Sequence, residues 1–89
     1  MDNAEAKILA AQLRRDLPEL DLHGFYPDQA LEQLGLFLSR LLEKNERASR
    51  VIYGGGSGKL RNSVFNYLQQ QPFVATIQDE GGSCLILLK

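Results

Sequence analysis

The chain has 89 residues, enough for one domain and too few for two, and 44% of them are hydrophobic, so a core can form. A net charge of −1 excludes a chain that binds nucleic acid through overall charge, and the single cysteine, Cys84, excludes an intrachain disulfide and favours a reduced, cytoplasmic setting. The apolar run at residues 85–88 is far shorter than the roughly 20 residues of a spanning helix, so we expect no membrane partner.

Hydrophobic periodicity divides the chain into three helices and four strands. The first helix ends before Leu17-Pro18, because the residue before a proline avoids helical angles. The expected elements, in chain order, are a helix over 3–16, a strand over 19–23, a helix over 27–44, a strand over 50–53, a helix from 59 that stops at 69–72, a strand over 73–79 and a strand over 83–88.

This order, α-β-α-β-α-β-β, predicts an α/β fold with a four-stranded mixed sheet. Strands joined through a helix pair in parallel, and the last two strands form a hairpin. The last strand is almost entirely apolar, so it belongs in the interior, which gives the strand order first-second-fourth-third. We expect a two-layer domain over residues 18–89 and an extra N-terminal helical extension over residues 1–17.

Four of the five residues from 54 to 58 are glycine, and a predicted helix follows them directly. Glycine lets a ligand approach the main chain, and a helix N-terminus offers free amides and the positive end of the helix dipole. The candidate phosphate-binding residues are therefore Gly54, Gly55, Gly56, Ser57 and Gly58, with charge added by Lys59 and Arg61. A merely flexible connection is the alternative. The loop is not a P-loop, whose first glycine would fall on Tyr53, nor a dinucleotide motif, whose last glycine would fall on Lys59.

Asp21 and His23 lie two residues apart on the first strand and so share a face, and His23 is the only histidine. Free imidazole titrates at about pH 6.5, so it can exchange protons near neutrality. Parallel strands end at the same side of a sheet, which should place this pair beside the glycine loop. Asp21 and His23 are therefore the candidate catalytic residues. The alternative is a surface acid and a histidine that caps the local backbone.

Other side chains give weaker indications. Residues 40–61 carry six basic residues against two acidic ones, which favours a local phosphate patch, with a solvated helix end and loop as the alternative. Ligand spacing for a metal is absent, so no metal-binding residue is predicted and a divalent cation stays open as a cofactor. Cys84 is expected in the core rather than as a nucleophile. Phe25 and Tyr26 could stack on bases, with core packing an equal alternative for Phe25.

Three segments together resemble the Smr (small MutS-related) domain family. They are Leu20-Asp21-Leu22-His23-Gly24, residues 28–34, and the run from Val51 to Arg61, within a likeness that spans about residues 18–89. The resemblance implies a two-layer β-α-β-α-β-β sandwich similar to the C-terminal domain of translation initiation factor three. It also implies nucleic acid, DNA or RNA, as the partner, because members nick or cleave these polymers, some of them at stalled ribosomes.

We therefore expect an endonuclease domain, with a non-catalytic module that binds nucleic acid or the ribosome as the alternative. One departure bears on this choice. Many members have histidine or threonine where this chain has Tyr53, and a phenol with a reference pKa of about 10 is a poor base. Tyr53 can still donate a hydrogen bond, so it is kept among the candidate phosphate-binding residues. The sequence leaves the oligomeric state open.

Overall fold

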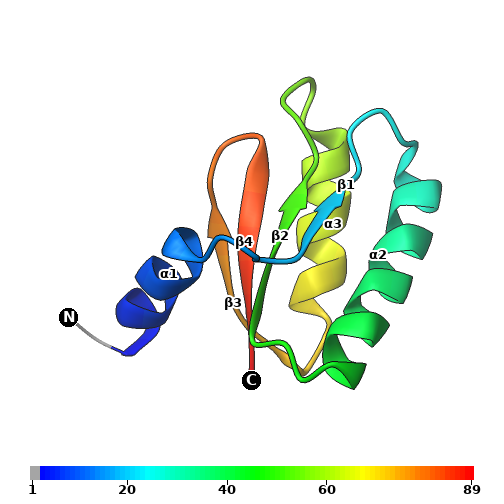
Figure 1. Ribbon diagram of the computed structural model, residues 1–89. Helices are drawn as coiled ribbons and strands as arrows, with labels where there is room; N and C mark the ends of the chain where they lie inside the picture. The colour runs from blue at the N-terminus through cyan, green and yellow to red at the C-terminus, as the bar shows by residue number, and fades with distance from the viewer. Residues whose placement is uncertain (1–2) are drawn as a thin grey trace.

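The computed structural model describes residues 3–89, which form a four-stranded sheet with two helices on one face and one on the other (Figure 1). The helices are α1 (Asn3–Leu13), α2 (Pro27–Glu43) and α3 (Lys59–Gln69). The strands are β1 (Glu19–Asp21), β2 (Ala48–Ile52), β3 (Val74–Asp79) and β4 (Ser83–Leu88). The sheet order is β1-β2-β4-β3, with β1 parallel to β2 and the other pairs antiparallel. The predicted α/β class and strand order are confirmed.

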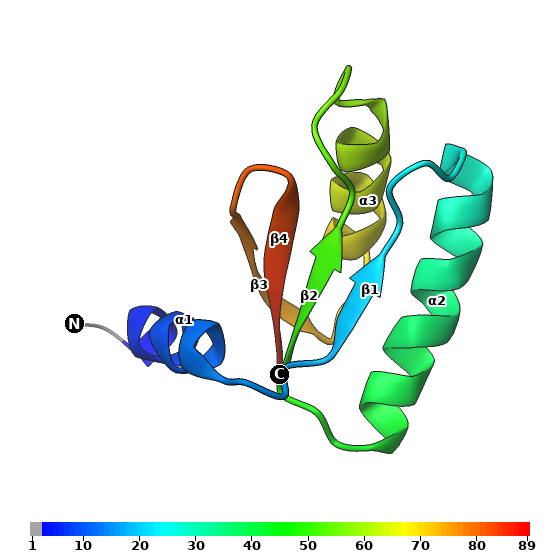
Figure 2. The same ribbon diagram turned by 45° about the horizontal axis from the view of Figure 1, so that its top comes forward.

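β4 lies inside the sheet and is covered on both faces, as its apolar sequence predicts. Cys84, Ile86 and Leu88 pack against α2 and α3, in the larger of two core clusters. Leu85 and Leu87 point the other way and pack in a second cluster with residues of α1. Figure 2 shows α1 on the opposite side of the sheet from α2 and α3. α1 is thus a cover for two leucines, each of which contributes about 1.5–3 kcal/mol when fully buried.

The predicted boundaries are wrong by two residues or more in three elements. α1 ends at Leu13 rather than at residue 16, β1 ends at Asp21 rather than at residue 23, and β2 spans 48–52 rather than 50–53. β1 stops early because the chain turns at Gly24, whose φ of +83° suits glycine. β2 begins early because β4 runs far enough to pair Leu87 with Ala48.

Candidate functional site

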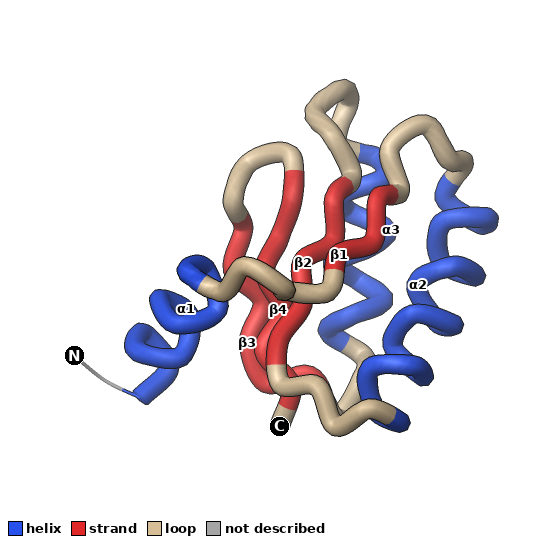
Figure 3. The backbone as a smooth tube through the Cα atoms, in the orientation of Figure 1, coloured by secondary structure: helices blue, strands red, loops and turns tan. Residues whose placement is uncertain are grey.

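β1 and β2 end side by side, so the segments that follow them leave the same side of the sheet. Asp21 pairs with Ile52, and the Leu22 amide donates to the Ile52 carbonyl over 2.7 Å. After β1 the chain enters a turn over residues 22–25, and after β2 it enters the glycine loop over residues 54–58 (Figures 2 and 3). A Cβ added to Gly54 would lie 3.5 Å from the Cβ of His23. The two segments singled out from the sequence are therefore adjacent.

A tight turn holds His23 against Asp21. The Phe25 amide donates to the Leu22 carbonyl over 3.1 Å and closes the turn. Oδ1 of Asp21 lies 3.0 Å from the backbone nitrogen of His23 and 2.6 Å from its ring Nδ1. The side-chain hydrogen bond with His23 is the largest cause that lowers the pKa of Asp21, so this carboxylate is ionised at neutral pH. The aspartate therefore orients the imidazole.

This pairing leaves one imidazole nitrogen open. An ionised carboxylate can only accept a hydrogen bond, so Nδ1 of His23 carries the proton and Nε2 of the neutral ring has a free lone pair. The His23 side chain is 70% exposed, and its one hydrogen bond in the described part of the chain is through Nδ1. Nε2 can therefore take a proton from a nucleophile that approaches from solvent.

The glycine loop has a main-chain conformation suited to an anion. Gly54, Gly56 and Gly58 have φ values of +80°, +70° and +86°, whereas the residues between them do not have positive φ. Such alternation turns successive amides toward one concave side. Within residues 3–89, the amides of Gly55, Gly56 and Ser57 have no hydrogen-bond acceptor. α3 begins directly after Gly58, so the positive end of its dipole lies at the glycine loop and also favours an anion there.

The turn between β3 and β4, residues 80–82, is the third segment of the candidate site, beside the turn over residues 22–25 and the glycine loop. The Gly82 carbonyl accepts from the amides of Tyr53, at 3.0 Å, and Gly54, at 2.8 Å. A Cβ on Gly82 would lie 3.5 Å from the Cα of Gly54. The Gly54 amide is therefore used by the Gly82 carbonyl, whereas the amides of residues 55–57 remain open to a ligand. We call residues 22–25, 54–58 and 80–82 the three-loop rim.

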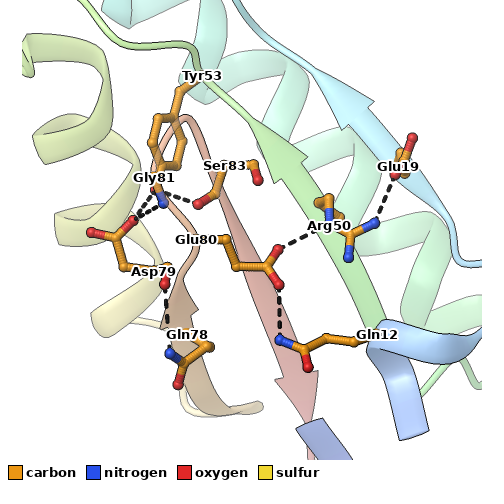
Figure 4. Close-up of polar contacts among 9 residues, drawn as sticks. All are labelled: Gln12, Glu19, Arg50, Tyr53, Gln78, Asp79, Glu80, Gly81 and Ser83. Atoms are coloured by element: carbon orange, nitrogen blue, oxygen red, sulfur yellow. Dashed lines mark hydrogen bonds and ion pairs between the residues drawn. The ribbon is translucent and has the colours of Figure 1, made fainter. Parts of the chain in front are cut away.

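Tyr53 is a core residue, which corrects the expectation that its side chain contacts phosphate. It is 4% exposed, and its ring packs edge-on against Phe65 with centroids 6.1 Å apart. Its hydroxyl lies 2.8 Å from the Ser83 carbonyl and 3.1 Å from Oδ1 of Asp79 (Figure 4). Burial is the largest cause that raises the pKa of Tyr53, and the Asp79 carboxylate adds to it. The phenol therefore acts neither as a base nor as a contact on the rim.

Arg61 lies next to the glycine loop, but its charge is already paired. Its Nε and Nη2 donate to Oδ2 of Asp79 over 3.1 and 2.8 Å, and its guanidinium lies 4.2 Å from the ring centre of Phe65. Arg61 is in turn the largest cause that lowers the pKa of Asp79. Lys59 is exposed and forms no ion pair with a described residue. Lys59 is therefore the available cation at the loop.

Asp79, the last residue of β3, lies beside the three-loop rim, and the sequence did not indicate it. Besides Arg61 and Tyr53, it accepts a hydrogen bond from the Gly81 amide over 3.1 Å. It thereby joins α3, the residue that follows β2 and the turn after β3. Its only signal in the sequence is its place just before Glu80-Gly81-Gly82, which marks a turn but no partner.

The basic stretch of residues 40–61 does not form one patch. Arg40 and Lys44 lie at the C-terminal end of α2, whose 17 residues make a helix about 25 Å long, while the rim is at its other end. Arg50 bridges Glu19 and Glu80, with nitrogen–oxygen distances of 3.0 Å to each (Figure 4). The predicted phosphate patch therefore reduces to Lys59 and the loop amides.

Two concave parts of the surface lie away from the rim. Two neighbouring grooves of about 430 and 330 Å³ run beside α1, and both are lined by Lys7, Arg47, Leu87 and Leu88. Among the described residues, no three His, Cys, Asp or Glu side chains gather as metal ligands, and no helix has the length and apolarity to cross a membrane.

Fold and rim together define an α/β domain in which a histidine just after a strand lies next to a glycine loop at a helix N-terminus. The family model described as Smr domain matches residues 20–89, and the chain belongs to that family. It is 35% identical over 75 residues to the endonuclease MutS2 of Exiguobacterium sibiricum, a match that covers 80% of this chain and 10% of the relative. The chain thus spans about a tenth of the length of the curated relatives it matches.

Two solved structures share this fold. The Smr domain of Thermus thermophilus MutS2 superposes with a TM-score of 0.78 at 23% identity, covering 82% of this chain and 99% of that one. YdaL, a stand-alone small MutS-related protein from Escherichia coli, superposes with a TM-score of 0.82 at 18% identity, covering 100% of this chain and 77% of that one. The expected family and its mixed-sheet α/β fold are confirmed.

Proposed function

We propose that this domain is an endonuclease that cuts DNA or RNA phosphodiesters at the three-loop rim. The observation that carries the proposal is the adjacency of His23 and Gly54, with the imidazole exposed and fixed by Asp21. A proton-transfer group and a set of anion-binding amides can each accelerate phosphodiester cleavage. The name endonuclease MutS2, carried by relatives of which this chain matches a small part, supports the same conclusion.

The chemistry follows from the positions of these groups. The amides of residues 55–57 and the ammonium of Lys59 bind the non-bridging phosphate oxygens and stabilise the charge that develops on them. Nε2 of His23 takes a proton from water, or from a ribose 2′-hydroxyl in RNA, as that oxygen bonds to phosphorus. The opposite P–O bond breaks, and the leaving oxygen takes a proton from the imidazolium or from solvent. Asp21 holds the ring and stabilises the imidazolium.

A cleavage assay on labelled single-stranded, double-stranded and branched substrates tests the proposal. Loss of a general acid–base group costs about 10²–10⁴-fold in rate, so His23→Ala should lose cleavage by that factor. Lys59→Ala should also be impaired, whereas the matched variant Lys44→Ala, at the far end of α2, should cleave like the parent. Equal rates for His23→Ala and the parent would refute the assignment. Loss of cleavage in the presence of a chelator would show that the reaction also depends on a divalent cation.

A non-catalytic module that docks nucleic acid or a ribosomal surface is the second candidate. Tyr53 favours it, because the position before the glycine loop holds a buried phenol and leaves His23 without a second proton-transfer partner there. This candidate predicts binding that weakens steeply with salt, no strand cleavage, and unchanged affinity in His23→Ala.

Domain boundaries and cellular setting belong to the same proposal. Residues 18–89 form the Smr-like domain and residues 1–17 an extension, of which residues 1–2 lie outside the described part and residues 3–17 cover Leu85 and Leu87. Burial raises the pKa of Cys84 to about 12, so this thiol is an inert core group, compatible with the cytoplasm. A version lacking residues 1–17 should fold with a lower unfolding midpoint. An unchanged midpoint would contradict the covering role.

A further inference from the structure

The aromatic residues fall into two groups by exposure. The chain has three tyrosines and four phenylalanines, and five of these seven belong to the larger core cluster or pack against it. The other two, Phe25 and Tyr26, are 44% and 73% exposed. They are consecutive, and they follow His23 within three residues. The two exposed aromatic side chains therefore lie in the first loop of the three-loop rim and directly after it.

Neither exposed side chain has a structural task within residues 3–89. Both lie outside the two core clusters. Tyr26 is the N-cap of α2, but its side chain makes no capping hydrogen bond, and only its carbonyl is used, by the Ala30 amide at 2.9 Å. The hydroxyl of Tyr26 has no hydrogen-bond partner among the described side chains. Side-chain capping thus does not account for Tyr26, and packing leaves 44% of Phe25 and 73% of Tyr26 in solvent.

The pair is within reach of a strand whose phosphate lies at the glycine loop. Successive Cα atoms are about 3.8 Å apart, so the Cα of Tyr26 is at most about 11 Å from that of His23. The turn over residues 22–25 and the start of α2 fix the main chain of both aromatics. A nucleobase next to the bound phosphate is therefore within reach of these two residues.

We propose that Phe25 and Tyr26 form a stacking platform for an unpaired base next to the phosphate bound at the rim. The inference rests on the proposed function and deepens it, since it assigns nucleic acid with unpaired bases as the preferred substrate class. A base inside a continuous duplex is stacked on its neighbours and does not offer its face to a side chain. Aromatic side chains stack on any base, so the platform distinguishes unpaired from paired strands and does not distinguish base sequences.

The test compares ligands with the same phosphates and different bases. Binding of a labelled single strand is measured by fluorescence anisotropy against an abasic strand of equal length and against the paired duplex. Each stacked base contributes about 1–3 kcal/mol, so the parent should bind the base-containing strand at least about fivefold more tightly than the abasic one. Phe25→Ala/Tyr26→Ala should abolish that preference. Tyr26→Phe, which keeps the ring, and Leu36→Ala, which removes an exposed leucine of α2, should retain it.

The outcomes separate this inference from the proposed function. Lys59→Ala should weaken binding to both strands equally, because it removes a phosphate contact. If the parent binds both strands equally, or if the double alanine variant keeps the preference, the platform is refuted while phosphate binding stands. If the parent binds no nucleic acid, the proposed function fails and the platform fails with it. Thermal unfolding of each variant confirms that these exposed substitutions leave the fold intact.

Discussion

Alanine substitutions at Gly56 and Gly55 form a matched pair that tests the conformation of the glycine loop. Gly56 has a φ of +70°, while Gly55 does not have positive φ, and a Cβ added to either residue would meet no atom within 4 Å. Steric clash therefore contributes to neither variant. Replacing glycine by alanine also makes the unfolded chain less flexible, which stabilises the fold by about 0.4–1 kcal/mol, and this gain is common to both variants. The difference between them is the strain of alanine in the left-handed region.

That strain is about 1–2 kcal/mol, so Gly56→Ala should be less stable than Gly55→Ala by this amount. In a domain of this size, 1 kcal/mol corresponds to about 4–8 °C in Tm. Thermal unfolding followed by circular dichroism, with both variants under the same conditions, measures the difference directly. Equal midpoints would show that the loop does not hold the alternating conformation that orients its amides, and the reasoning for an anion site would fail.

Three further substitutions probe the surroundings of the rim. Tyr53→Phe removes a buried hydroxyl that contacts the Ser83 carbonyl and Asp79, and urea unfolding should show a loss of about 1–2 kcal/mol; no loss would mean that these contacts do not stabilise the fold. Ser49→Ala removes a buried hydroxyl without a partner among the described residues, so the free energy of unfolding should stay the same or rise; a loss would reveal a hidden acceptor. The pKa of Asp79 is lowered in the fold, mainly by Arg61, so its contribution to stability is present above the unfolded value of about 3.9 and is lost as the pH falls through the lower folded value. Asp79→Asn should therefore lose less stability than the parent when Tm is followed from pH 6 into the acid range, and parallel curves would contradict the pairing.

The order of the sheet was predictable because it follows from local patterns. β4 is apolar at nearly every position, and such a strand requires cover on both faces. β3 has polar residues at three of its six positions, as suits an edge strand. The parallel pairing of β1 and β2 follows from the helix between them, and it predicts that His23 and the glycine loop lie on the same side of the sheet.

The partners of the charged residues were not predictable, because they depend on contacts between distant elements. Arg61 and Asp79 are 18 residues apart, and Arg50 reaches partners 31 and 30 residues away. Counted along the chain, both arginines belong to a basic stretch. In the fold, each faces a carboxylate on a neighbouring strand or turn. Tyr53 was misassigned for the same reason, since its burial depends on Phe65 of α3.

Titration of the isotope-labelled chain with a short oligonucleotide, followed by amide and imidazole NMR shifts, tests the central claim most directly. We expect the largest changes at residues 55–59 and at the ring of His23, because the phosphate should sit between them. Changes confined to the grooves beside α1, around Lys7 and Arg47, with residues 55–59 unmoved, would contradict the account.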